Sequence, residues 1–220
     1  MRRLVAPFVL LLAFAMPAWA GDASEYRFLG FSDDLKYCAF EISGVYDGSG
    51  FPYTTVYLVI VDSNDYAAGP IEATGENGET PEEVRSSAEE SAAMRLKALR
   101  IDGSNIGIGS EISGDHVLAA TLQGEKAPYE LRLVERDVGN DPDTDQAQKM
   151  FELDVVNDGR SQVLQKDSSL PRGRKGAYQY GIRAAYVNGD KVAVFVEFLR
   201  AGFEGPDTRQ MIVTGALRTR

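Results

Sequence analysis

Residues 178–199, YQYGIRAAYVNGDKVAVFVEFL, decide the fold. They contain two runs rich in Val, Ile, Tyr and Phe, 178–187 and 191–199, joined by Asn188-Gly189-Asp190. Such residues favour β-strands. An Asn-Gly pair adopts the positive φ angles of a tight turn between twisted strands. The stretch therefore predicts an antiparallel hairpin.

Similar runs recur along the chain and are separated by Gly, Asp and Asn. They are residues 26–31, 37–42, 55–61, 116–122, 129–135, 150–156 and 209–215. Short strands at a hairpin's distance from one another are typical of all-β proteins. We therefore expect a mainly β fold of antiparallel sheets, packed as a sandwich or as a barrel-like domain.

One segment, about 80–101, has helical periodicity. Its apolar residues recur every three or four positions: Val84, Ala88, Ala92, Leu96 and Leu99. Thr80 and Glu83 form a capping-box pattern around Pro81, and Gly103 is the residue expected to end the helix. Because the apolar stripe is narrow and mostly Ala, we expect this one helix to pack closely on a sheet. The preceding residues 63–79 contain several Gly, Asn and acidic residues, which predicts a mobile surface loop.

A weak internal repeat emerges at an offset of 155 residues, where 31–41 resembles 186–196. A loop with Gly, an aromatic residue and an acid follows in each place. Two hypotheses stay open: two pseudo-repeated three-stranded meanders, about 26–61 and 178–215, or convergence of unrelated hairpins. In either case residues 21–220 are expected to form a single domain.

The first 20 residues have the pattern of a secretory signal peptide. Arg2 and Arg3 precede the apolar run 4–15, and Ala18-Trp19-Ala20 is a small-x-small cleavage site. We expect cleavage after Ala20 and a periplasmic or secreted location. No later stretch approaches the roughly 18 apolar residues of a membrane span, so we expect a soluble chain with no transmembrane anchor after cleavage.

The composition excludes several classes of function. The chain has 23 Lys and Arg against 33 Asp and Glu, a net charge of −10, which argues against binding nucleic acid. With one Cys and one His, it has neither the ligands of a usual zinc site nor an intrachain disulfide. Alternation along the strand puts Cys38 on the same face as Phe40 and Ile42, which predicts a core residue and not a nucleophile.

Calcium is the one cofactor that the spacing of acidic residues suggests. Asp141, Asp143 and Asp145 alternate as in a calcium-binding loop. Gln146 stands where such a loop needs Gly, however, and strands are expected on both sides. A solvated acidic hairpin is therefore the favoured interpretation, and otherwise no cofactor is expected.

Two aromatic and acidic loops are the candidate ligand site. One contributes Tyr46, Asp47, Phe51 and Tyr53, and the other contributes Phe203, Glu204 and Asp207. If the loops lie side by side, their rings and acids form a composite surface suited to carbohydrate or cationic ligands. The alternative is that the rings cap the open end of the core.

The leading functional hypothesis is a non-enzymatic binding or interaction module of the bacterial cell envelope, with a protein or carbohydrate partner. The alternative is a hydrolase of envelope or extracellular polymer that uses carboxylates and His116. Gly48-Ser49-Gly50 lacks the spacing of a serine nucleophile elbow. The basic run 172–176 is interpreted as a solvated loop.

Three places carry a resemblance to known families. Residues 29–40, LGFSDDLKYCAF, look like the hairpin of a TolB-type propeller blade, although Asp34-Leu35 departs from its usual turn. This hairpin, the loop 47–53 (DGSGFPY) and the segment 202–207 (GFEGPD) together resemble a family of predicted secreted bacterial proteins known only as a domain of unknown function. The resemblance implies an exported bacterial protein and assigns no catalytic or binding residue.

Overall fold

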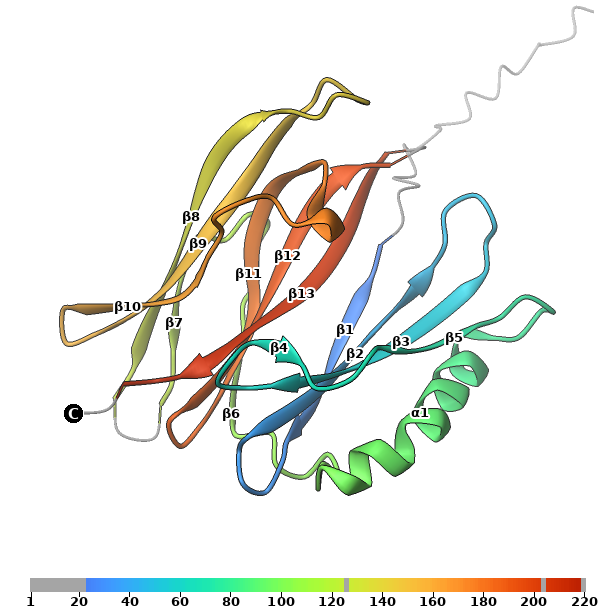
Figure 1. The fold of residues 1–220 in the computed structure, drawn as a ribbon, viewed down its shortest axis with the longest axis horizontal. Helices are drawn as coiled ribbons and strands as arrows, with labels where there is room; N and C mark the ends of the chain where they lie inside the picture. The colour runs from blue at the N-terminus through green and yellow to red at the C-terminus, as the bar shows by residue number, and fades with distance from the viewer. Residues whose placement is uncertain (1–22, 125–126, 203–204, 219–220) are drawn as a thin grey trace, which may run out of the picture.

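The computed structural model describes residues 23–124, 127–202 and 205–218 (Figure 1). Three antiparallel sheets form successive layers, and one helix covers the outer side of the first. The N-terminal sheet has the order β1 (Glu25–Phe31), β2 (Tyr37–Val45), β3 (Pro52–Ile60) and β4 (Asp65–Tyr66), with β5 (Ile71–Thr74) also paired to β3. The central sheet has the order β13 (Pro206–Ala216), β12 (Lys191–Ala201), β11 (Ala177–Asn188) and β6 (Ile108–Glu111). The outer sheet has the order β10 (Arg160–Lys166), β9 (Ala147–Asn157), β8 (Tyr129–Asn140) and β7 (Ala119–Leu122).

The predicted hairpin at Asn188-Gly189 is β11–β12, and it lies in the central sheet. Successive side chains of a strand point to opposite faces. Val194 and Val196 therefore face the outer sheet, and Phe195 faces the N-terminal sheet, all fully buried. Because both faces are covered, β12 needs apolar residues at consecutive positions, which explains the run VAVFV.

The predicted helix is α1 (Pro81–Ala98), and its start is confirmed, with Thr80 and Glu83 forming both bonds of the capping box. Its buried residues Val84, Ala88 and Ala92 pack against the N-terminal sheet, as the narrow stripe predicts. The expected end at Gly103 is wrong. Arg100 takes the left-handed conformation (φ 55°), and the Ile101 amide donates to the Leu96 carbonyl at 2.9 Å, which closes the helix earlier.

The prediction of a mobile loop over 63–79 is wrong where β4 and β5 form. Strand β5 pairs with β3 and contacts α1, so part of this segment extends the N-terminal sheet. Strands β6 and β10 were also not predicted. All four are short or polar, and they have a pairing partner on only one side. Such strands bury few side chains and therefore lack a strong apolar pattern.

The two predicted meanders are β1–β2–β3 and β11–β12–β13, and they pack face to face. Phe40 and Phe195, which are equivalent at the offset of 155, meet edge to face with ring centroids 5.7 Å apart. Leu35 in the first hairpin turn lies near Gly189 in the second. The two hairpins therefore meet across the layer boundary, and the internal repeat stays a prediction.

The sheets stay open and stacked, so the sandwich form of the prediction is confirmed and the barrel-like form is wrong. The likeness of β1–β2 to a TolB-type blade is not confirmed, because this hairpin belongs to the stack. Over the residues that the structure describes, no helix is long and apolar enough to cross a membrane.

Candidate functional site

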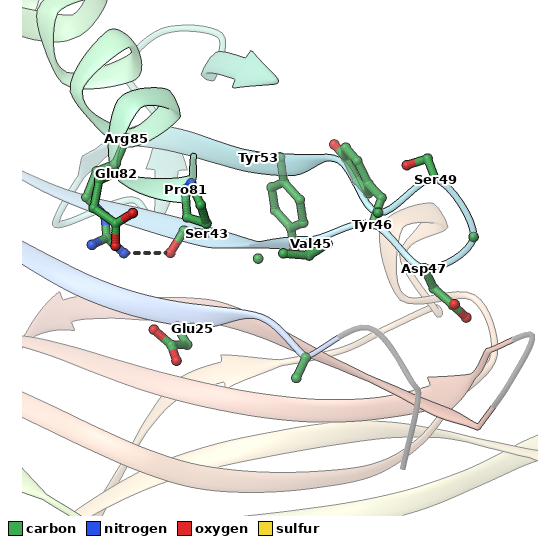
Figure 2. A pocket seen from close by; sticks show the side chains of 14 residues that line it. Glu25, Ser43, Val45, Tyr46, Asp47, Ser49, Tyr53, Pro81, Glu82 and Arg85 are labelled. Carbon is green, nitrogen blue, oxygen red and sulfur yellow. Dashed lines mark hydrogen bonds between the residues drawn. The ribbon is translucent and has the colours of Figure 1, made fainter. Parts of the chain in front are cut away.

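A groove of about 780 Å³ opens at one end of the N-terminal sheet (Figure 2). It lies between the start of β1, the loop that joins β2 to β3, and the first turn of α1. We call it the loop groove. It is lined by Ala23, Glu25, Ser43, Gly44, Val45, Tyr46, Asp47, Gly48, Ser49, Gly50, Tyr53, Pro81, Glu82 and Arg85.

Two tyrosines form an aromatic wall of the loop groove. Tyr46 stacks on Tyr53 with ring centroids 4.3 Å apart and planes at 20°. The Tyr46 hydroxyl donates to Glu72 at 2.8 Å, and Arg209 donates to the Tyr53 hydroxyl at 3.2 Å. Burial and the bond to Glu72 raise the pKa of Tyr46 to about 12. The phenol of Tyr46 is therefore neutral at physiological pH, and the wall is fixed at both hydroxyls.

The loop after β2 owes its shape to two glycines. Gly48 and Gly50 have φ of 85° and 70°, which other residues adopt only with strain. The Tyr46 amide donates to the Phe51 carbonyl at 2.9 Å, and the Gly50 amide donates to the Tyr46 carbonyl at 3.0 Å. This frame holds Asp47 at the groove. One carboxylate oxygen of Asp47 is buried, and no described group donates a hydrogen bond to it.

Arg85 lines the opposite end of the loop groove and is held from below. Its Nε lies 2.9 Å from Oε1 of Glu41, and another nitrogen donates to the Ser43 hydroxyl at 3.0 Å. Glu41 is fully buried beneath α1 and receives two 2.8 Å hydrogen bonds from Arg27, which also pairs with Glu89. The Arg85 guanidinium is thus fixed before any ligand arrives.

The loop groove is acidic. Glu25, Asp47 and Glu82 line it, and none of them forms an ion pair with a described residue. The positive charge of Arg85 is offset by the buried Glu41. Lining carboxylates without a cationic neighbour favour a positively charged ligand.

The second predicted loop segment lies beside the first. Asp207 is buried and lies 3.2 Å from nitrogens of both Arg200 and Arg209. Arg209 also reaches Tyr53, so the structure brings the ends of the two meanders together at one rim. Phe203 and Glu204 lie outside the described residues.

The predicted site residues therefore differ in their roles. Tyr46, Asp47 and Tyr53 line the loop groove, although Tyr53 is only 6% exposed. Asp207 is also 6% exposed and supports the groove through Arg209, which reaches Tyr53. Phe51 is 38% exposed and is not among the lining residues. The aromatic loops thus form part of the wall of the loop groove and part of the cap over the core, which was the alternative prediction.

Sequence reasoning did not pick out Glu25, Glu82 or Arg85 as site residues. They approach one another only because β1, β2 and α1 converge, and no local motif marks them. The one available signal was the alternation of β2, which puts Glu41 on the face opposite Cys38 and Phe40. A charged residue on that face of a central strand calls for a cationic partner above it.

His116 is engaged away from the loop groove. Its Nε2 lies 3.1 Å from Glu135, which also accepts hydrogen bonds from Lys149 at 2.8 Å and from the Tyr180 amide at 2.7 Å. Burial alone would raise the pKa of Glu135, but the bonds from Lys149, Tyr180 and His116 hold it below its usual range. Cys38 is buried as predicted, and burial raises the pKa of its thiol.

Asp141, Asp143 and Asp145 lie in the turn between β8 and β9. Asp141 is buried and accepts from the Asp143 amide at 2.8 Å, while Asp143 pairs with Lys175. No three His, Cys, Asp or Glu side chains lie close enough to hold a metal ion in the part of the chain that the structure describes. Calcium binding here stays an untested prediction.

The interpretation of 172–176 as a solvated loop is wrong for Arg174. This residue is buried and forms two hydrogen bonds with Asp167, at 2.6 and 2.7 Å. Its guanidinium also lies over the Phe151 ring, 4.8 Å from the centroid. Arg174 thus joins the edge of the outer sheet to the turn before β11.

Comparison with known proteins adds a family to this geometry. No curated protein and no solved structure matches the chain. A family model described as a predicted secreted protein, DUF2259, matches residues 39–216, from β2 to the end of β13. The match starts after β1 and the β1–β2 turn, but it covers most of the chain and includes the β2–β3 and β12–β13 loops. The chain therefore belongs to the DUF2259 family of predicted secreted proteins.

Proposed function

We propose that this protein is a non-enzymatic binding module of the bacterial cell envelope and that the loop groove is its ligand site. The observation that carries the proposal is the preformed groove itself. Tyr46 and Arg85 are held by Glu72 and Glu41, and Asp47 sits on a loop shaped by glycines. A site that is ordered before binding spends little free energy on ordering its side chains.

The groove suits binding better than the hydrolase alternative. General acid-base chemistry needs a base within hydrogen-bond reach of a nucleophile or substrate. His116 is paired with Glu135 elsewhere, and Cys38 is buried with a raised thiol pKa. Tyr46, Asp47 and Arg85 instead supply the aromatic and charged contacts that recognise a sugar or a peptide.

The location that we propose is the periplasm or the cell exterior, reached after cleavage behind Ala20. The predicted signal peptide lies outside the described residues, and family membership supports export. Mass spectrometry of the protein purified from the exporting host should give a chain that begins at Gly21. Recovery of an intact N-terminus from the membrane fraction would contradict cleavage.

The binding proposal is tested by titrating ¹⁵N-labelled exported protein with soluble disaccharide-peptide fragments of peptidoglycan. These fragments present both partner chemistries, a carbohydrate and a peptide. We expect amide shifts to concentrate on the loop groove, at Glu25, on the 43–50 segment and around Arg85. Tyr46→Ala should weaken binding about tenfold while the melting temperature stays nearly unchanged.

Phe51→Ala is the matched control, because this exposed ring of the same loop does not line the groove. It should bind as the parent protein does. Shifts spread evenly over the surface would remove the proposal. Release of new reducing ends or peptide termini from the fragments, lost in Asp47→Asn, would establish the hydrolase alternative instead.

A further inference from the structure

The C-terminal end of strand β2 extends beyond the start of its neighbour β1. Its pairing with β3 extends to Val45, which lies opposite Pro52, whereas its pairing with β1 begins only at Ser43, opposite Glu25. Before Glu25 the chain turns away from β2. The Ser24 amide donates to the carbonyl of Thr208 at 3.2 Å, and Ala23 bridges to the same residue in β13.

This departure leaves a short free edge on β2. In an antiparallel pair, successive residues direct their amide and carbonyl groups to alternate sides. The Tyr46 amide bonds to Phe51 on the β3 side, so the amide and carbonyl of Val45 point to the other side. That side is the floor of the loop groove, which Gly44 and Val45 line. Nothing within the described ranges forms a hydrogen bond to the Val45 backbone there.

We propose that the loop groove accepts an extended basic peptide, which adds as a short strand to the free edge of β2 at Val45. The peptide would run antiparallel to β2 and in line with β1. Main-chain bonds to Val45 would give affinity, and the walls would select side chains. This inference rests on the proposed function and names the ligand of that site.

Charge complementarity identifies the peptide as basic. The carboxylates of Glu25, Asp47 and Glu82 line the groove without ion pairs to described residues, and one oxygen of Asp47 is buried without a donor. A Lys or Arg side chain in the groove would pair with these lining carboxylates. Stacked on Tyr53, the ring of Tyr46 offers a face to the aliphatic part of such a side chain. The volume of about 780 Å³ lies within the range of peptide and small-molecule sites.

Three synthetic pentapeptides test the inference by isothermal titration calorimetry against the exported protein. One alternates valine with lysine, the second alternates valine with glutamate, and the third repeats the lysine sequence with N-methylated backbone amides. We expect the lysine peptide to bind, the glutamate peptide to bind at least about tenfold more weakly, and N-methylation to abolish binding because strand addition needs those amides. Amide hydrogen exchange at Val45 should slow on binding.

Variants of the protein separate the contribution of backbone hydrogen bonds at Val45 from that of the negative charge of Asp47. Val45→Pro removes the outward amide at an edge position where proline is tolerated, and it should weaken binding at least about fivefold. Val45→Thr keeps the amide and should bind like the parent. Asp47→Asn should weaken binding of the lysine peptide, but the unmethylated lysine peptide should still bind more tightly than the methylated one.

Two results would overturn the inference. Equal binding of the methylated and unmethylated lysine peptides would contradict binding by strand addition. Equal binding of the lysine and glutamate peptides would contradict a preference of the groove for basic peptides. If peptidoglycan fragments shift the groove amides while no pentapeptide binds, only this inference fails. If neither class of probe shifts these amides, the proposed function fails with it.

Discussion

At the scale of single residues, the most consequential side chain is Glu41. It is fully buried between the N-terminal sheet and α1, and Arg27 and Arg85 both reach its carboxylate. A buried charge is tolerated only when opposite charges and hydrogen bonds compensate it. Alternation along β2 places Glu41 on the face opposite Cys38 and Phe40 and indicates a cationic partner there, but no local motif identifies Arg27 and Arg85 as the partners.

We expect Glu41→Gln to destabilise the fold by roughly 1.5–3 kcal/mol, because it weakens the charge-assisted hydrogen bonds of Arg27 and Arg85, whose partly exposed guanidinium groups remain solvated. Urea denaturation followed by circular dichroism measures the change. Glu89→Gln removes the exposed partner of Arg27 and should cost below about 1 kcal/mol. A similar decrease in the free energy of unfolding in the two variants would show that Glu41 does not stabilise the fold more than the exposed Glu89 does.

Asp167 provides a pH-dependent test. Burial alone would raise the pKa of its carboxyl, but hydrogen bonds from Arg174, the Phe151 amide and Gln165 hold it below the ordinary 3.8. A folded-state pKa below the unfolded value stabilises the fold above the unfolded pKa, and this contribution is lost as pH falls through the folded pKa. The free-energy gap between the parent and Asp167→Asn should therefore be constant from neutral pH down to about 5 and should narrow below about 4. A gap independent of pH would contradict the ion pair with Arg174.

At the scale of elements, the backbone is strained at Arg100, just after the end of α1, and a substitution can relieve this strain. Arg100 occupies the left-handed region with φ of 55°, where a side chain is disfavoured and glycine is not. The amides of Arg100 and Ile101 close the helix by donating to the carbonyls of Lys97 and Leu96. The position is exposed, so little packing depends on the arginine itself.

We expect Arg100→Gly to stabilise the protein by up to about 1 kcal/mol, as the relief of backbone strain exceeds the added entropy of the unfolded chain. The melting temperature should rise accordingly. Arg100→Ala keeps the Cβ atom and should give no such gain. A gain from alanine equal to that from glycine would assign the effect to the lost charge.

The elements that bury many apolar side chains could be predicted from the sequence, and those that bury few could not. The hairpin β11–β12 has long buried apolar runs on either side of an Asn-Gly turn, and α1 has a capping box with Val84, Ala88 and Ala92 buried at helical spacing, so both carry clear local signals. Strand β10 exposes most of its residues, and β5 is held by pairing with β3, so neither has an apolar pattern to read. The loop groove was predicted only through Tyr46, Asp47 and Tyr53, because Arg85 joins it from α1, a contact that no local pattern encodes.

At the scale of the molecule, the central sheet determines the architecture. It is buried on both faces, with Phe195 against the N-terminal sheet and Phe198 against the outer sheet. The two meanders meet at one end through their hairpin turns, where Leu35 lies near Gly189. At the other end Arg209 of β13 reaches Tyr53 of β3 beside the groove. Close packing across this layer boundary therefore keeps the groove in shape.

A double-mutant cycle tests that packing. Phe40 and Phe195 are in edge-to-face contact across the boundary, so Phe40→Leu and Phe195→Leu should each destabilise the fold and together fall short of additivity by about 0.5–1.5 kcal/mol. The control pairs Phe40→Leu with Phe198→Leu. Phe198 faces the other layer, and those two losses should add within about 0.5 kcal/mol. Equal coupling in both pairs, measured by urea denaturation, would show that the layers respond as one unit and that the direct contact between the meanders is not what joins them.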